Sequence, residues 1–197
     1  MRHLLAALLI LAGGAASAQT IPVGEISAYL NRLDTATAEF TQINADGTIS
    51  TGDLAIRRPG RVRFDYDPPN RGLVVAGGGQ VAVFDPVSNT PPEQYPLSRT
   101  PLSLILANNV NLSRSGMVVQ HGGDGTSTSI TLQDPNTPQA GRIQLVLTPD
   151  PVTLRQWVIT DDAGQKTTVI LGDMEVGRTL SSTMFSIPQE LARRGLN

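Results

Sequence analysis

Cysteine is absent from all 197 residues. A chain without cysteine forms no disulfide, has no thiolate nucleophile and offers no thiolate ligand to a metal. It also lacks the cysteine that carries the lipid of an exported lipoprotein, so we expect that the protein is not a lipoprotein itself. Histidine is nearly as scarce, since His3 and His121 are the only two. A metal site built on several histidine and cysteine side chains is therefore excluded.

Long apolar runs are also missing. The apolar run over residues 4–12 is well short of the ~20 residues that a membrane-spanning helix needs. Together with the basic start before it and the Ala-Ser-Ala sequence that ends at Ala18, this run predicts a secretory signal peptide over residues 1–18. The remaining 179 residues, 19–197, are enough for a single domain with a sizeable core.

Neither sign of charge dominates the chain. Lys166 is the only lysine, and removal of Arg2 with the signal peptide leaves 14 of the 15 basic residues against 17 acidic ones, a net charge near −3. Proteins that bind nucleic acid neutralise phosphates with clustered lysine and arginine. We therefore expect no nucleic-acid partner.

No set of residues points to catalysis. His121 is the one histidine after the signal peptide, and a Ser-His-Asp site built on it is strongly disfavoured. Asp65 and Asp67 alternate with arginines on the same predicted strand face, which favours solvated ion pairs over a metal site. The three glycines at 77–79 are flanked by strands and lack a following Lys-Ser/Thr, so they indicate a hairpin and not a phosphate loop. We predict a binding protein that is not an enzyme and needs no cofactor.

Alternating apolar and polar residues predict a mainly β protein with a few helices. About ten short strands separated by turn signals indicate an antiparallel sheet that is large enough to curl. The expected strands are residues 38–43, the segments around Leu54 and Phe64, and residues 72–76, 80–85, 117–121, 126–132, 143–148, 154–160 and 166–171. Helical spacing of apolar residues predicts one helix within residues 22–39, and residues 101–106 form a second, short and very apolar one. These helices are expected to cover the concave side of the sheet.

One arginine falls on the apolar side of this pattern. The strand with Leu54 and Ile56 and the strand with Val62, Phe64 and Tyr66 expose their apolar residues on one face if Arg58 lies opposite Val62 across a three-residue turn. Gly60 or its neighbour is then left-handed. In this arrangement Arg58 follows Leu54 and Ile56 onto the apolar face. A buried guanidinium costs several kcal/mol unless its donors are satisfied, so we expect Arg58 to bind a specific partner.

Two interpretations of the concave face remain open at this point. Either the two helices fill it permanently, or they form a removable cover over a site for a hydrophobic ligand. Arg58 favours the second interpretation, because a buried arginine can bond to carbonyls at helix ends when the cover is closed and release them when a ligand enters.

An ordered set of motifs resembles a known family. The set comprises F-T-Q at 40–42, G-D-L-x-I-x-R-P at 52–59, R-x-R-F-D-Y-x-x-P at 61–69, the glycine hairpin with Gln80-Val81, P-L-S-L-I-L at 101–106 and D-x-x-G-Q-x-T at 161–167. It is similar, over essentially the whole mature chain, to the periplasmic outer-membrane lipoprotein carriers of the LolA family. The resemblance implies an incomplete antiparallel β-barrel with a helical lid. It also implies a soluble periplasmic carrier that shields the acyl chains of lipoproteins between an inner-membrane ABC transporter and an outer-membrane receptor.

The resemblance assigns roles to residues. Arg58 would be the lid latch, with partners near Leu33 in the first helix and near Ile105 and Leu106 in the second. With only 4% aromatic residues, the cavity is expected to be largely aliphatic. The expected lining is Leu54, Ile56, Val62, Phe64, Tyr66, Val75, Val83, Leu102, Leu104, Leu145, Leu147 and Trp157. We expect a monomer. The alternative function is binding or sensing of another lipid or amphiphile, and a hydrolase is the least favoured class.

Overall fold

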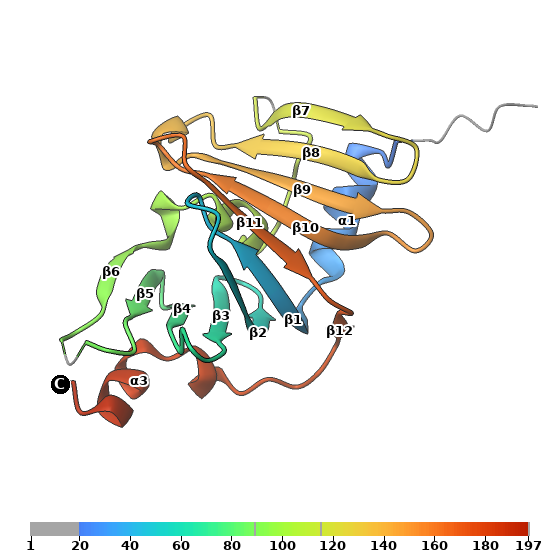
Figure 1. Cartoon of the computed structure of the whole chain (residues 1–197). Coiled ribbons are helices and arrows are strands. Elements are labelled where there is room, and N and C mark those ends of the chain that lie inside the picture. The colour runs from blue at the N-terminus through green and yellow to red at the C-terminus, as the bar shows by residue number, and fades with distance from the viewer. Residues whose placement is uncertain (1–19, 89, 115, 197) are drawn as a thin grey trace, which may run out of the picture.

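A single antiparallel sheet dominates the computed structural model, which describes residues 20–88, 90–114 and 116–196. The predicted signal peptide, residues 1–18, lies outside the described residues. The strand order is β6-β5-β4-β3-β2-β1-β11-β10-β9-β8-β7, with β12 paired to β1. The strands are β1 (Thr35–Ile43), β2 (Ile49–Arg57), β3 (Arg61–Tyr66), β4 (Leu73–Gly77), β5 (Gln80–Phe84), β6 (Glu93–Pro96), β7 (Val118–Gly123), β8 (Thr128–Gln133), β9 (Arg142–Thr148), β10 (Thr153–Thr160), β11 (Lys166–Leu171) and β12 (Glu175–Val176). The end strands β6 and β7 are far apart, so the sheet is not closed (Figure 1). The predicted incomplete barrel is confirmed.

Most strands coincide with the predicted ones to within two or three residues, but β6 forms between residues 85 and 101, where no strand was predicted. Its sequence, Glu93 to Pro96, has no apolar alternation. It becomes a strand because its backbone pairs with the edge of β5, from Gln80↔Pro96 to Val83↔Glu93. A pattern of side chains does not reveal a strand that depends on backbone pairing alone.

The turn between β2 and β3 has the predicted length and a different register. Ile56 pairs with Val62 and Arg57 with Arg61, so the three-residue turn is Arg58 to Gly60. The expected pairing of Arg58 with Val62 is wrong by two residues. Because side chains alternate with period two, this shift leaves the predicted apolar face unchanged. Gly60 has φ 69°, the left-handed conformation that was expected there.

Two helices cover the concave face, as predicted. The first, α1 (Val23–Arg32), follows Pro22 and buries Ile26 and Leu30 in the main core. It lies behind β8, β9 and β10 in Figure 1, and the Tyr29 hydroxyl accepts a hydrogen bond from the Leu154 N–H of β10 at 3.0 Å. The second, α2 (Leu102–Leu106), buries its last three residues. Neither these nor any other helix of the described residues has the length and apolar character to cross a bilayer.

A third helix, which the sequence analysis missed, packs on the opposite face of the sheet. This helix is α3 (Ile187–Arg194), and the 3-10 turn η3 (Ser182–Phe185) precedes it. Ile187 and Leu191 pack against a small second core on β4 and β5. Its sequence signals were present, since Ser186 caps the first turn and Gly195 ends the helix in a left-handed conformation. Two further 3-10 turns, η1 (Leu97–Arg99) and η2 (Pro138–Ala140), lie in connections.

Candidate functional site

The concave face is the main hydrophobic core, and its side chains come from strands on both halves of the sheet. Alternation places every second residue of each strand on this face. Its buried side chains are at most 5% exposed in β2 and β3 and at most 1% exposed in β9 and β10, while Tyr66 of β3 and Ile159 of β10 are only partly buried. They include Leu54, Ile56, Val62 and Phe64 from one half, and Leu145, Leu147 and Trp157 from the other. Leu104 and the half-buried Tyr66 and Leu102 pack on the same cluster.

An aromatic row crosses the interior of the sheet. Tyr66 meets Phe40, Phe40 meets Phe64 and Phe64 meets Trp157, all edge to face, with ring centroids 5.2, 5.3 and 6.2 Å apart. Phe64 is on β3 and Trp157 on β10, with three strands between them. The path from β3 to β10 takes four steps between neighbouring strands, which in a flat sheet would span roughly 19 Å. The 6.2 Å contact between the two rings therefore shows that the sheet curls until its walls touch. The interior is therefore filled by side chains, and a ligand has to separate the walls or displace the cover.

One predicted cavity residue lies on the wrong face. Val75 is opposite Arg63 and is fully buried in the second core beneath α3, so its assignment to the concave face is incorrect. All five residues of β4 are apolar or glycine, and alternation cannot be recognised in such a run. Val83 pairs with Val74 and shares the concave side with it.

The turn between β2 and β3 lies beneath the ends of both covering helices. Arg58 Nη1 donates to the Leu30 carbonyl near the end of α1, and Nη2 donates to the Ala107 carbonyl just after α2, at 2.5 Å. The last carbonyls of a helix have no partner within the helix and carry partial negative charge. A guanidinium placed between two helix ends therefore satisfies both.

Two backbone bonds support the same junction. The N–H of Arg58 donates to the Asp34 carbonyl at 2.7 Å, and the N–H of Gly60 donates to the Leu106 carbonyl at 2.8 Å. The expected partners Leu33 and Ile105 do not accept from the Arg58 side chain, and Leu106 contacts the turn through its own carbonyl and Gly60. Burial lowers the pKa of the half-buried Arg58, and the charge of Asp34 opposes this shift. The guanidinium stays charged, because arginine is not deprotonated in proteins.

The helix α1 and the segment that follows α2 are also joined to each other, through Asn31, a residue that the sequence pattern did not indicate. The Asn31 amide donates to the Val110 carbonyl at 2.9 Å and accepts from the Val110 N–H at 2.8 Å. The Leu112 N–H donates to the Ser27 hydroxyl at 3.2 Å. The first helix and the segment after α2 thus form one connected lid. No periodicity reveals such a pair, because Asn31 is an exposed helical residue in the sequence pattern.

Comparison with known proteins identifies the family. The family described as "Outer membrane lipoprotein carrier protein LolA" matches residues 31–188, which include the Arg58 turn and α2. The chain belongs to the LolA family. A protein named outer-membrane lipoprotein carrier protein from Methylococcus capsulatus is 26% identical over 93% of this chain and 91% of its own length. Another of that name, from Pseudomonas aeruginosa, is 25% identical over 83% of this chain and 82% of its own.

Among solved structures, a LolA superfamily protein from Nitrosomonas europaea is 10% identical, with a TM-score of 0.43 over 84% of this chain and 98% of that one. The resemblance seen in the sequence motifs is confirmed by the family match, which covers most of the chain.

Two of the open grooves on this LolA-family chain have charged residues in their walls. A groove of about 470 Å³ on the outer face runs between β1 to β3 and the C-terminal segment, and Asp53, Asp65 and Arg178 are among its lining residues. Another, of about 690 Å³, is lined by Arg99, Asp134 and other polar residues. Charged walls are unsuited to hydrocarbon, so these two grooves are poor sites for an apolar ligand.

Proposed function

We propose that the protein is a periplasmic carrier that shields the acyl chains of lipoproteins on its concave face. One observation carries the proposal. A single turn, Arg58 to Gly60, binds the ends of both helices that cover an apolar face, and the half-buried Arg58 supplies the side-chain bonds. The relatives named outer-membrane lipoprotein carrier proteins support it, and they align with most of the chain. Membership of a carrier family agrees with the prediction that the chain is not an enzyme.

A comparison of the lid contacts with the burial of acyl chains favours a lid that is opened by its cargo. Two charge-assisted and two backbone hydrogen bonds contribute on the order of 4 to 9 kcal/mol to the closed lid. A buried methylene contributes about 0.8 kcal/mol, so one chain of about 14 methylenes contributes about 11 kcal/mol. One or two acyl chains are therefore sufficient to offset the loss of the lid contacts. Leu54, Ile56, Val62 and Phe64 on one wall, and Leu145, Leu147 and Trp157 on the other, then contact the chains.

The route between membranes follows from the same balance. An inner-membrane ABC transporter would load the carrier, which stays soluble after its signal peptide is removed. A receptor at the outer membrane would accept the chains. Because nothing in the carrier is consumed, transfer is favourable only if the receptor binds the chains better than the open carrier does. Closure of the empty lid contributes to this transfer, since it stabilises the carrier after release.

Arg58→Leu tests the latch. The variant loses the side-chain bonds to the Leu30 and Ala107 carbonyls and to the Asn31 amide, and it keeps the two backbone bonds of the turn. We therefore expect it to fold and to accept cargo. It should deliver that cargo at least tenfold more slowly, because the empty closed state is weakened by more than 1.4 kcal/mol. The measurement is transfer of a fluorescently labelled diacylated lipoprotein from the loaded carrier to outer-membrane vesicles.

Arg61→Leu is the matched control, because Arg61 lies beside the same turn and pairs with Arg57 on the outer face. Normal delivery by Arg58→Leu would contradict the latch. Native mass spectrometry of protein purified from the periplasm tests the cargo. A lipoprotein adduct supports the proposal, and a small lipid alone supports the alternative of a sensor or carrier for another amphiphile.

A further inference from the structure

The single tryptophan of the chain, Trp157, has a donor that the fold does not use. Its side chain is 1% exposed on β10, between Leu145 of β9 and Val169 of β11. Among the described residues, no atom accepts a hydrogen bond from the indole Nε1. Arg58 Nε is the other such nitrogen, but its guanidinium is already bound through both Nη atoms. Among the described core residues, Trp157 is therefore the one with a buried polar side chain whose only donor has no partner.

Such a donor needs an explanation, because most buried polar groups in proteins are paired. An aromatic side chain without a donor, such as phenylalanine, would avoid the cost of a desolvated N–H. A water molecule is a poor partner here, since it needs two to four polar neighbours and the flanking side chains are apolar. The ring of Phe64 is perpendicular to the indole, with centroids 6.2 Å apart, but an N–H contact to a ring is weaker than one to a carbonyl.

From this orphaned donor we infer that the Trp157 indole N–H is a subsite for an acyl ester carbonyl of the cargo. The inference rests on the proposed carrier function and adds a polar contact to it. Indole nitrogen is a donor only, so its partner has to be an acceptor. In an acylated lipid the acceptors attached directly to the hydrocarbon chains are the acyl carbonyls, and diacylated and triacylated lipoproteins share two ester-linked chains. The chains would part Phe64 from Trp157 and place a carbonyl where the ring now lies.

The position of Trp157 fits a group exposed by lid opening. Leu154, three residues earlier on β10, donates its N–H to the Tyr29 hydroxyl of α1. Displacement of α1 therefore frees the backbone of β10 three residues before the indole. Trp157 also lies on the wall opposite β3, the strand that follows the Arg58 turn. A chain that enters beneath the lid meets this donor on the far wall.

The test compares two probes that differ only in the carbonyl, 1,2-dioctanoylglycerol with ester links and 1,2-dioctylglycerol with ether links. Each is titrated by calorimetry into the wild-type protein and into Trp157→Phe, which keeps one aromatic ring and removes the pyrrole ring with its N–H. The ratio of ester to ether affinity should be roughly 5- to 30-fold higher in the wild type than in the variant. The smaller side chain of the variant changes the affinity for both probes alike, so the ratio isolates the effect of the N–H. Comparing the two ratios cancels the different hydration of esters and ethers.

Equal ratios in the two proteins, with both probes bound, would overturn the subsite and leave the carrier function intact. Binding of neither probe by the wild type would overturn both. The wild type also permits a measurement without mutation, because all indole signals come from Trp157. The ultraviolet resonance Raman band of the indole N–H should move to its hydrogen-bonded position with the ester and stay in place with the ether, and an unchanged band with bound ester would overturn the subsite.

Discussion

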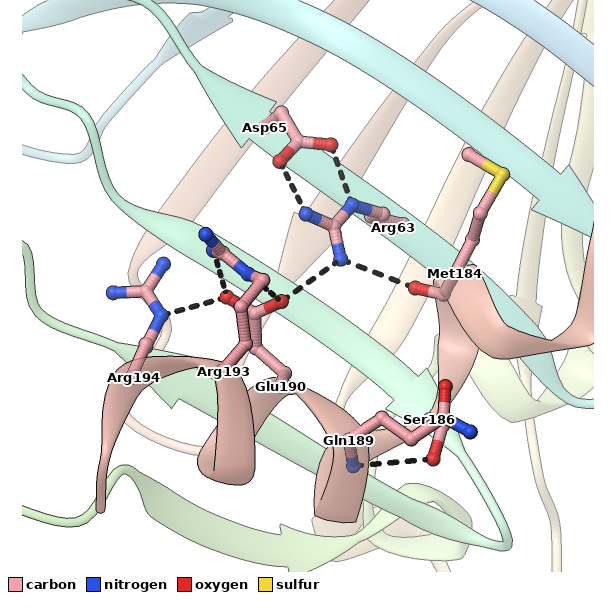
Figure 2. Close-up of polar contacts among 8 residues, drawn as sticks. All are labelled: Arg63, Asp65, Met184, Ser186, Gln189, Glu190, Arg193 and Arg194. Carbon is pink, nitrogen blue, oxygen red and sulfur yellow. Dashed lines mark hydrogen bonds and ion pairs between the residues drawn. The ribbon is translucent and has the colours of Figure 1, made fainter.

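The two faces of the sheet are covered by helices that are fastened in different ways. On the concave face, Arg58 and Asn31 bond to backbone groups of the lid, and the contact surface is the apolar core itself. On the outer face, α3 is fastened by a cluster of charged side chains around the buried Glu190 (Figure 2). A few hydrogen bonds over an apolar face can be exchanged for contacts with an apolar ligand. A buried carboxylate between arginines has no such replacement, so the outer cover is a permanent part of the fold.

The charged cluster ties α3 to β3. Glu190 lies 2.5 Å from Arg193 and 2.7 Å from Arg194 on its own helix, and 3.7 Å from Arg63 on β3. Arg63 also binds Asp65 at 2.6 Å and the Met184 carbonyl at 3.1 Å, as Figure 2 shows. Burial alone raises the pKa of Glu190, but hydrogen bonds from Arg193 and Arg194 and the charge of Arg63 outweigh it and hold the pKa at about 2.

Strand β3 contributes side chains both to the concave core and to the charged cluster beneath α3. Val62 and Phe64 point into the concave face, while Arg63 and Asp65 point toward α3. The outer cover therefore anchors the strand that follows the Arg58 turn. We expect the two covers to differ in how readily they open, and three changes test this difference.

The largest expected effect comes from Glu190→Ala. It leaves Arg63, Arg193 and Arg194 without their shared carboxylate, and breaking a buried pair from one side costs about 3 to 5 kcal/mol of unfolding free energy. Urea unfolding followed by circular dichroism measures the loss. Glu175→Ala is the matched control, because its pair with Arg178 is exposed and contributes less than about 1 kcal/mol. Equal losses in the two variants would show that the outer cluster is not a fastening.

A smaller effect is expected from Asn31→Ala on the other face. The buried Val110 loses the partner of both its N–H and its carbonyl, at a cost of about 1 to 3 kcal/mol in the closed lid. The lid should open more often, so the variant should bind more of an apolar fluorescent dye than the wild type does, with unchanged protection of α3 against hydrogen exchange. Asn136→Ala, in an exposed loop, is the control. Dye binding equal to that of the wild type would contradict a connected lid.

Lowering the pH is expected to have the smallest effect on stability. It distinguishes the outer cover, α3, from the inner cover, α1 and α2, without a mutation. The pKa of Glu190 is about 2 in the folded protein and lower than its ordinary value of 4.5, so its contribution is complete above pH 4.5 and falls as the pH approaches 2. Asp65, which shares Arg63, is the other carboxylate bonded in the cluster. Hydrogen exchange at pH 5 and pH 3, corrected for intrinsic rates, should show α3 losing more protection than α1. Equal losses would mean that the two covers open together.

How far the sequence predicts this protein depends on the kind of contact. Period-two alternation identified the strands, and the same alternation placed Arg58 on the apolar face even though its pairing was two residues off. It failed at Val75, because β4 is apolar on both faces. The helix α3 has capping signals in the sequence at Ser186 and Gly195, although it was not predicted. Strand β6 had no side-chain signal of any kind.

The sequence by itself determined that one sheet face is apolar and that Arg58 accompanies it, because chain geometry alone sets the period of a strand. Only the tertiary structure decided that this arginine binds the carbonyls of Leu30 and Ala107, and that Phe64 meets Trp157 across the interior. Those contacts join residues 28 to 93 positions apart, and they depend on how strongly the sheet curls and where the helices end. No local pattern encodes either quantity.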